Sequence, residues 1–378
     1  MGSEAQASYN GPAAGPAVSA PPAPSAKAID SDWCLDFWYP ALRSNRVRAG
    51  KLQAAMLLGI PLAVGRDNQG RVFAVRDSCP HRGMPFTEGW YDGELIECSY
   101  HGWKFDGQTG RCREIPSLTA DQDLDVEKIR AKSFPCEEHD GYVWVYMAHP
   151  GSREERRPAP RLPKFSDSYR GIQLEAHLPC SIDHGIIGLM DPAHGPFVHQ
   201  AWWWRGRRSI HEKQKVFEPI PNGFRMKAHS PSANSAPYKL LGVYGKPITT
   251  TIEFELPNIR REEIHCGDYW FASQTTVTPE TPDRCRIDFV AAWNLFPWAP
   301  FLTPVLRWFG NRFIGQDQRT MEKQAQGLKY DPSLMLIDDA DRPAKWYFQL
   351  KAGYIESKRN GVPMPHPMDG PVTLRWRS

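Results

Sequence analysis

Two short segments in the first third of the sequence carry cysteine and histidine at spacings that suit metal ligation. One reads C-x-H and contains Cys79 and His81; sixteen residues later the other reads C-x2-H and contains Cys98 and His101. Four such ligands can hold one tetrahedral zinc ion, or an iron–sulfur cluster with both cysteines on one iron and both histidines on the other. One cysteine and one histidine per segment favours the cluster, and C-x-H departs from the spacing of zinc fingers.

A second set of candidate ligands lies in the pattern D-x2-H-x4-H, formed by Asp191, His194 and His199. In a straight α-helix the two histidines would point about 140° apart, so they would not share one ion. Gly195-Pro196 between them predicts a bend that removes this difficulty. Pro192 is placed to start a helical turn, with Asp191 and His194 on one face. Two imidazoles suit a non-haem iron, which needs one further carboxylate.

Short strands and turns must position the first set of ligands. The turn residues at 67–70 and 107–110 separate strand-like runs and predict two hairpins, 62–76 and 103–113. Further strands are expected at 95–98 and 142–147. Each ligand segment therefore follows a strand, and each is succeeded by a glycine, which lets the backbone turn close to a metal centre.

The second half mixes strands with helices. A buried strand is expected at 287–296, a proline-rich loop at 297–304 and a helix at 305–328. The 18 residues of 289–306 include no charged side chain, which approaches the length of a membrane span. Three prolines interrupt them, so no continuous helix is expected and membrane contact is at most peripheral.

Length and composition narrow the class of protein. The 378 residues predict two or three domains, and 41% hydrophobic with 24% charged residues is ordinary for a globular chain. With 14 Trp, 13 Tyr and 17 Phe, the chain can build an apolar pocket as well as a core. A net charge of +3 without a long basic run gives no reason to expect a nucleic-acid partner.

The cellular compartment is predicted from the cysteines and the N-terminal composition. Eight cysteines in 378 residues are too sparse for a disulfide scaffold. Residues 1–28 are rich in Ala and Pro and are expected to be a disordered tail. They have neither a basic start nor an unbroken apolar stretch, so a secretory signal is not expected. We therefore expect a cytoplasmic protein.

The two cysteine/histidine segments together resemble the Rieske domain of Rieske non-haem iron oxygenases. The similarity lies in Cys79-Pro80-His81-Arg82-Gly83 and in Cys98-Ser99-Tyr100-His101-Gly102-Trp103, and it extends over about residues 36–150. The resemblance implies one [2Fe–2S] cluster held by those two cysteines and two histidines. It also implies an α+β fold, with an all-β Rieske domain at 29–150 and an α+β catalytic domain of helix-grip (START-like) type at 151–378.

The resemblance also completes the second ligand set. Rieske oxygenases take a third iron ligand from an aspartate on a C-terminal helix, and the segment 315–322 is similar to that helix. We therefore assign His194, His199 and Asp317 to one mononuclear Fe(II), with Glu322 and Asp338 as reserve carboxylates.

The resemblance further assigns Asp191 a catalytic role as a bridge between the cluster ligand His101 of a neighbouring subunit and His194. This role implies a homotrimer. An alternative role for Asp191 is a helix cap. Many members of the family carry Asn three or four residues before this aspartate, where this chain has Gly188 and Ile187.

The implied function is that of a terminal oxygenase in a multicomponent system. It would use O2 for hydroxylation or oxidative demethylation of a small apolar, aromatic or polycyclic substrate, as in vanillate O-demethylase and pheophorbide a oxygenase-like members. No dinucleotide-binding G-x-G-x-x-G and no plant-type ferredoxin motif is found. Electrons are therefore expected from NAD(P)H through a separate reductase, a ferredoxin or both.

Three alternatives stay open at this point. The chain could be a cis-dihydroxylating ring dioxygenase, a Rieske electron-transfer or redox-sensing protein without a working mononuclear iron, or a zinc-stabilised binding protein. The basic aromatic segment 202–208 is equally open. It could dock an acidic ferredoxin, line the substrate pocket, or serve as core anchors followed by a solvated turn.

Overall fold

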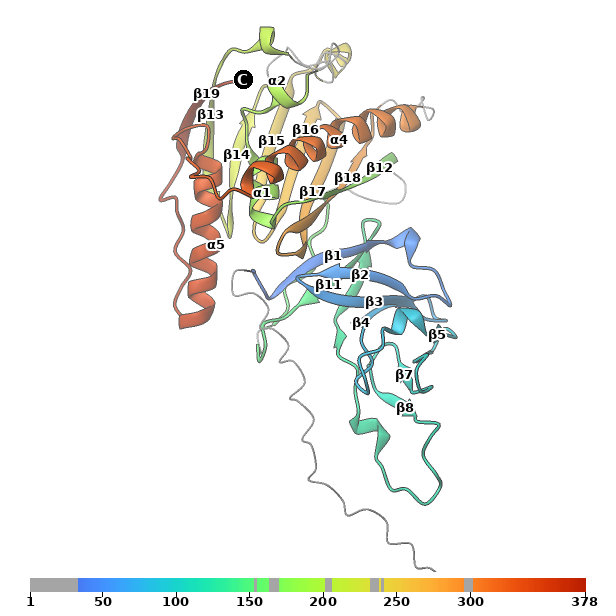
Figure 1. Ribbon diagram of the computed structural model, residues 1–378. Coiled ribbons are helices and arrows are strands. Elements are labelled where there is room, and N and C mark those ends of the chain that lie inside the picture. The colour runs from blue at the N-terminus through green and yellow to red at the C-terminus, as the bar shows by residue number, and fades with distance from the viewer. Residues whose placement is uncertain are drawn as a thin grey trace, which may run out of the picture.

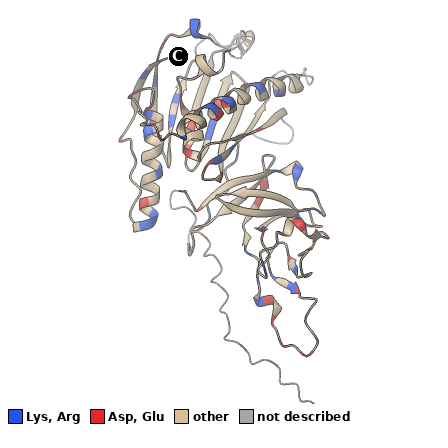
Figure 2. Ribbon diagram, in the orientation of Figure 1, with Lys and Arg blue, Asp and Glu red and all other residues tan. Residues whose placement is uncertain are grey.

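The computed structural model describes residues 33–152, 155–162, 170–200, 206–231, 238, 241–295 and 302–378. The expected tail at 1–28, Trp202–Arg205 of the basic aromatic segment and most of the proline-rich loop lie outside the described residues. Two β-rich units follow each other along the chain and lie at opposite ends of the molecule (Figure 1). Lys and Arg are interspersed with Asp and Glu in both units (Figure 2).

Three small antiparallel sheets build the N-terminal unit. Their strand orders are β1-β11-β10, β2-β3-β4-β9 and β5-β6-β7-β8. The bounds are β1 Phe37–Arg43, β2 Gln53–Leu57, β3 Ile60–Arg66, β4 Val72–Arg76, β5 Trp90–Tyr91, β6 Leu95–Glu97, β7 Lys104–Asp106, β8 Cys112–Glu114, β9 Ser133–Phe134, β10 Cys136–His139 and β11 Tyr142–Met147. Three single 3-10 turns, Ser44–Arg46, Phe86–Glu88 and Val126–Lys128, interrupt these strands.

Both predicted hairpins of this unit are confirmed, because β3 pairs with β4 and β7 pairs with β8 in antiparallel register. The first turn is closed by the Asp67 carboxylate, which accepts hydrogen bonds from the backbone N–H groups of Gln69 and Arg71 at 2.9 and 2.8 Å. An aspartate at the start of a turn favours this local closure. The first hairpin leads into the cysteine/histidine loop that follows β4. The second hairpin begins directly after the cysteine/histidine loop that follows β6.

One large antiparallel sheet dominates the C-terminal unit, in the order β12-β18-β17-β16-β15-β14-β13-β19. Its strands are β12 Arg170–Leu178, β13 Glu212–Ile220, β14 Gly223–His229, β15 Ile248–Glu255, β16 Ile259–Cys266, β17 Tyr269–Thr281, β18 Arg284–Trp293 and β19 Val372–Arg377. The α-helices are α1 Ile182–Met190, α2 Gly195–Val198, α4 Leu302–Leu328 and α5 Arg342–Asn360, and short 3-10 turns lie at Arg207–Ser209 and Gly242–Tyr244. The expected α+β class, with an all-β N-terminal part, is confirmed.

Helix α4 lies across one face of the large sheet (Figure 1) and packs on β12 through Ile314, which joins Ile172 and Leu174 in one buried cluster. The predicted helix at 305–328 is thus confirmed, beginning three residues earlier. None of the helices in the described ranges combines the length and apolar character that a membrane crossing needs.

A buried charge cluster joins the two units. The Arg286 guanidinium of β18 donates to the carbonyl of Pro40 in β1 at 2.7 Å and pairs with Asp288 at 2.9 Å. The β2–β3 turn adds backbone bonds, from the N–H groups of Leu58 and Gly59 to carbonyls of β17 residues at 2.9 and 2.8 Å. Since a buried ion pair needs hydrogen bonds to offset its lost hydration, the contact to Pro40 makes Arg286 depend on the correct placement of both units.

Candidate metal centres

Cys79, His81, Cys98 and His101 come together at the tips of two loops of the N-terminal unit. Both cysteines are buried, each with 2% of its surface exposed. The imidazole rings of His81 and His101 lie 4.5 Å apart, measured between centroids. The side chain of Cys98 lies close enough to interact with that of Cys79, so the two loops bring their thiols together as well as their imidazoles.

The two loops are built alike around their cysteines. The N–H of Gly83 donates to the carbonyl of Cys79 at 2.8 Å, and the N–H of Gly102 donates to the carbonyl of Cys98 at 2.9 Å. Both glycines have positive φ angles, 77° and 67°, a region that side chains with a Cβ adopt only with strain. The glycine after each ligand segment thus closes a tight turn that presents the ligands.

The electrostatics of these loops favour neutral imidazole. Burial lowers the pKa of His81, and the positive charges of His101 and Arg82 act in the same direction. A lowered pKa keeps the ring neutral at physiological pH, which is the form that ligates a metal. The ring of His81 also stacks on Trp103, with centroids 4.4 Å apart and planes 6° apart, and this contact orients it.

The donor set of these loops fits a Rieske cluster. Burial raises the pKa of the Cys79 thiol to about 11, although backbone N–H groups of His81 and Arg82 point toward its sulfur. A bound metal reverses such a shift, because a coordinating thiol is deprotonated. Among the described residues, Nδ1 of His101 is buried without a hydrogen-bond partner. A metal would satisfy this nitrogen.

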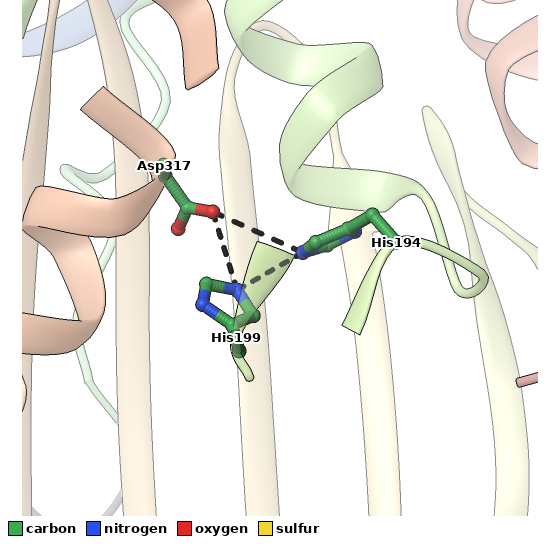
Figure 3. A group of neighbouring side chains, drawn as sticks. All are labelled: His194, His199 and Asp317. Atoms are coloured by element: carbon green, nitrogen blue, oxygen red, sulfur yellow. Dashed lines mark hydrogen bonds and ion pairs between the residues drawn. The ribbon is translucent and has the colours of Figure 1, made fainter. Parts of the chain in front are cut away.

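His194, His199 and Asp317 form the second group, which Figure 3 shows converging from two segments. Nε2 of His194 lies 3.1 Å from Nε2 of His199. Oδ1 of Asp317 lies 3.2 Å from Nε2 of His199 and 3.9 Å from Nε2 of His194. Asp317 is carried by α4, whereas the histidines flank the four-residue helix α2.

The expected helical turn beginning at Pro192 is wrong by three residues. Helix α1 ends at Met190, Asp191 is extended with φ −65° and ψ 117°, and helix resumes only at Gly195 with Pro196 in the first turn. Extended backbone is the usual conformation before proline. The Asp191 carboxylate also accepts from the N–H of Ala193 at 2.7 Å, a local closure that competes with helix.

Hydrogen bonds identify the proton-bearing nitrogen of each histidine. Nδ1 of His194 lies 2.8 Å from the backbone carbonyl of Asp191, which can only accept. Nδ1 of His199 lies 3.2 Å from Oε1 of Gln316. With both Nδ1 atoms donating, the lone pairs of both Nε2 atoms face the Asp317 carboxylate. Three electron-pair donors that converge in this way could hold a cation, and two imidazoles with one carboxylate suit non-haem iron.

Asp191 lies beside this group rather than in it. Its Oδ2 is 3.6 Å from Nδ1 of His194, and 32% of its side chain is exposed. Burial raises the pKa of Asp191, and the negative charge of Asp341 acts in the same direction, while His194 opposes both. The carboxylate therefore touches a candidate ligand on one side and is open to contact on the other.

The reserve carboxylates do not join the ligand group. Glu322 accepts from Gln318 on an exposed face of α4, and Asp338 pairs with Arg342 and Lys345 at 3.1 and 2.9 Å. Gly188 faces Met321 of α4, 3.5 Å from where its Cβ would lie. The sequence analysis assigns no role to Gln316. Its position directly before the predicted ligand Asp317 is the feature of the sequence that could have indicated one.

Comparison with known proteins gives two matches to protein families. Residues 37–135 match the Rieske [2Fe-2S] domain, and residues 174–350 match the vanillate O-demethylase oxygenase C-terminal domain.

Among curated relatives, the chain is 28% identical over 297 residues to chlorophyllide a oxygenase of Chlamydomonas reinhardtii, covering 75% of this chain and 42% of that protein. It is 29% identical over 173 residues to the 5,5'-dehydrodivanillate O-demethylase oxygenase subunit of Sphingobium sp., covering 44% and 39%. It is 32% identical over 130 residues to 4beta-methylsterol monooxygenase of Methylococcus capsulatus, covering 34% and 35%. The chain thus spans less than half the length of these relatives.

Solved structures share the fold. Dicamba monooxygenase bound to dicamba superposes with a TM-score of 0.69 at 20% identity, over 86% of this chain and 98% of that one. A variant of NdmA from Pseudomonas putida CBB5 with caffeine gives a TM-score of 0.69 at 17% identity, over 86% and 91%.

Proposed function

We infer that this chain, which belongs to the Rieske oxygenases as an oxygenase (alpha) component, is the terminal oxygenase of a multicomponent system. Its reaction would be the O2-dependent hydroxylation or oxidative demethylation of an apolar ring compound. The relatives are named for chlorophyllide a, a methylsterol and dehydrodivanillate, all of which are ring compounds. They support the substrate class without selecting one substrate.

The convergence of His194, His199 and Asp317 carries this proposal. A protein that only transfers electrons through a cluster needs no second set of ligands. Here the chain brings two imidazoles and a carboxylate to one point from segments more than 100 residues apart, as the 117-residue separation of His199 and Gln316 illustrates. We propose that these three residues hold one mononuclear Fe(II), and that the four cysteine and histidine side chains of the N-terminal unit hold one [2Fe–2S] cluster.

When bound, the cluster supplies single electrons and the mononuclear iron supplies the activation of O2. The residues of the chain supply the environment. Cys79 and Cys98 bury their sulfurs, and His81 is kept neutral. His194 keeps its proton on Nδ1 through the Asp191 carbonyl. His199, with 3% of its surface exposed, is shielded from water by the ring of Phe313 at 3.6 Å.

We further propose a homotrimer in which each cluster serves the mononuclear site of its neighbour. The elements that carry the two ligand sets lie at far ends of one chain (Figure 1), so transfer within a chain would cross the molecule. The exposed side of Asp191 would then receive His101 of the partner subunit. A carboxylate between two imidazoles can orient both, and the Asp191 carboxylate lies 3.6 Å from Nδ1 of His194, whose proton the Asp191 carbonyl accepts.

The remaining assignments rest on the same proposal. We propose a tail at 1–28, a Rieske domain at 29–150 and a catalytic domain at 151–378. Electrons would come from NAD(P)H through a separate reductase, a ferredoxin or both. None of the eight cysteines forms a disulfide, which suits a reducing compartment and supports the proposed cytoplasmic location.

Metal and sulfide content tests the proposal. Protein purified without oxygen should contain about three irons and two labile sulfides per chain, one cluster plus one mononuclear ion. The Asp317→Ala variant should lose only the third iron, and substrate-dependent O2 consumption with it. About two irons and two sulfides, unchanged after addition of Fe(II), would instead identify an electron-transfer protein, and zinc without sulfide would exclude both functions.

A further inference from the structure

We propose that Gln316 is a positioning residue that holds the proton of His199 on Nδ1 and thereby directs the Nε2 lone pair into the ligand group. This inference rests on the proposed mononuclear metal site and deepens it. It concerns how the site selects one tautomer of the proposed ligand His199. Gln316, which makes this selection, is not itself a ligand.

Helix α4 supplies this contact and two further contacts to the same ring. Gln316 precedes Asp317 on α4, so one helix delivers both a carboxylate toward Nε2 of His199 and an amide toward Nδ1 of the same ring. One turn earlier on that helix, Phe313 stacks on His199 with centroids 3.6 Å and planes 14° apart. Three residues of α4 therefore hold His199 at both nitrogens and on one face.

The amide matters because a neutral imidazole has two tautomers. Only the form with the proton on Nδ1 leaves a lone pair on Nε2. The group that accepts the other nitrogen's proton decides which form is present. Since His199 is 3% exposed, water is poorly placed to replace Gln316. Without that acceptor, the buried Nδ1–H would be unsatisfied and the wrong tautomer would gain population.

The two histidines differ in how they are held, which makes the idea testable. His194 donates to the backbone carbonyl of Asp191, an acceptor that no side-chain substitution removes. His199 donates to a side chain that can be replaced.

The experiment compares two replacements with a matched control on the same helix. Gln316→Leu removes the acceptor at similar size, and Gln316→Glu keeps an acceptor and makes it stronger. Gln318→Leu is the control, because Gln318 contacts only Glu322 in the contacts described, at 3.2 Å on an exposed face. Full-length protein with its cluster intact, verified by visible absorption, is freed of mononuclear metal and titrated with Co(II) under anaerobic conditions.

We expect Gln316→Leu to bind Co(II) about 10–100-fold more weakly, the usual cost of removing an outer hydrogen bond to a ligating histidine. Gln316→Glu should bind at least as tightly as the wild type, because a carboxylate acceptor raises the basicity of the ring. Gln318→Leu should not differ from the wild type. In the Co(II) protein, the shifted and solvent-exchangeable imidazole N–H proton of His199 should exchange faster in Gln316→Leu, while that of His194 should not.

Two results would overturn the inference. One is Gln316→Leu binding Co(II) as tightly as the wild type with both N–H signals unchanged. The other is Gln316→Glu failing as badly as Gln316→Leu, since this would make size and shape, rather than the acceptor, the requirement. If the wild type with an intact cluster binds no Co(II) while Asp317→Ala behaves identically, the mononuclear site of the proposed function fails, and this inference fails with it.

Discussion

At the scale of single residues, the cysteine/histidine loops and the group of His194, His199 and Asp317 hold their histidine side chains in two different ways. Around the cluster loops, positive-φ glycines close the turns and a stacked tryptophan orients His81. In the second group, hydrogen bonds to Nδ1 select the histidine tautomers. At both sites a ligand residue alone is not enough to bind a metal, because neighbouring residues decide whether its lone pair is available.

Replacing Asp191 by Asn should leave both metal centres in place and nearly abolish turnover. The substitution keeps the side chain's size, but it removes a carboxylate that lies 3.6 Å from Nδ1 of His194 and is exposed on its other side. Iron and sulfide per chain should match the wild type, while substrate-dependent O2 consumption coupled to reductant should fall by at least tenfold. Normal coupled turnover would contradict the bridging role.

Replacing Gly102 by Ala should cost the protein its cluster. At a φ of 67° a Cβ adds strain of about 1–2 kcal/mol, and here it would also meet Pro116 at 3.2 Å. Gly50→Ala is a matched control, since Gly50 has a φ of 68° and nothing within 4 Å of the added Cβ. Both variants should lose stability in chemical denaturation, Gly102→Ala more than Gly50→Ala because of the Pro116 contact, whereas labile sulfide should fall in Gly102→Ala alone. Equal sulfide in the two variants would rule out a special role for this turn.

At the scale of elements, α1 and α5 anchor the segment that carries the histidines. The Asp183 carboxylate in the first turn of α1 accepts from Lys351 of α5 at 2.8 Å and from the hydroxyl of Tyr347. Burial raises the pKa of Tyr347 well above its usual value, and the charge of Asp183 acts in the same direction, so the hydroxyl stays protonated as a donor. The start of α1 is thus held while its end turns into the ligand segment.

Replacing Asp183 by Ala should reduce the free energy of unfolding by about 1–3 kcal/mol, because the largely buried ammonium of Lys351 and the Tyr347 hydroxyl would lose their acceptor. Only 12% of the Lys351 side chain is exposed. The measurement is denaturant unfolding, with Glu356→Ala on the exposed face of α5 as the control. A loss no greater than that of the control would show that this contact does not stabilise the fold.

At the scale of the whole molecule, the charge cluster between the two units couples them. Arg286 and Asp288 expose 5% and 2% of their side chains, and Glu280 exposes 7%. Burial raises the pKa of Asp288 against the opposing charge of Arg286. The Pro40 carbonyl therefore replaces part of the hydration that Arg286 loses on burial, and this hydrogen bond links β18 to β1.

Replacing Arg286 by Met should destabilise the protein by about 3–5 kcal/mol, since it leaves the buried Asp288 carboxylate without the counter-charge that pairs with it. The double variant Arg286→Met, Asp288→Leu should recover part of that loss, because two apolar side chains can replace a buried ion pair. Denaturant unfolding of the two variants measures this recovery. If the double variant were less stable than the single one, packing and not charge would dominate at this junction.

Electron exchange between subunits predicts complementation of two inactive chains. Cys98→Ala lacks a cluster ligand and Asp317→Ala lacks an iron ligand, so neither should turn over substrate alone. Co-expressed in equal amounts, they should recover about a quarter of wild-type activity per chain, the statistical share of intact sites next to an intact cluster in a cyclic trimer. Absence of activity in verified mixed oligomers would contradict exchange between neighbours.

The sequence alone determined the ligand residue types, their two local spacings and the hairpins beside them, because these depend on a few neighbouring residues. The pattern D-x2-H-x4-H placed two histidines close in the chain, but the position of the helix break was misjudged, since the carboxylate of Asp191 closes its own turn. Proximity of Asp317 was suggested only by resemblance.

Only the tertiary structure decided what depends on distant segments meeting. Gln316 reaches His199 across 117 residues, and Arg286 reaches Pro40 across 246. Neither contact has a local signature, because hydrogen bonds between elements depend on where sheets and helices pack rather than on propensity. The tautomer of each histidine and the junction of the two units are therefore properties of the fold.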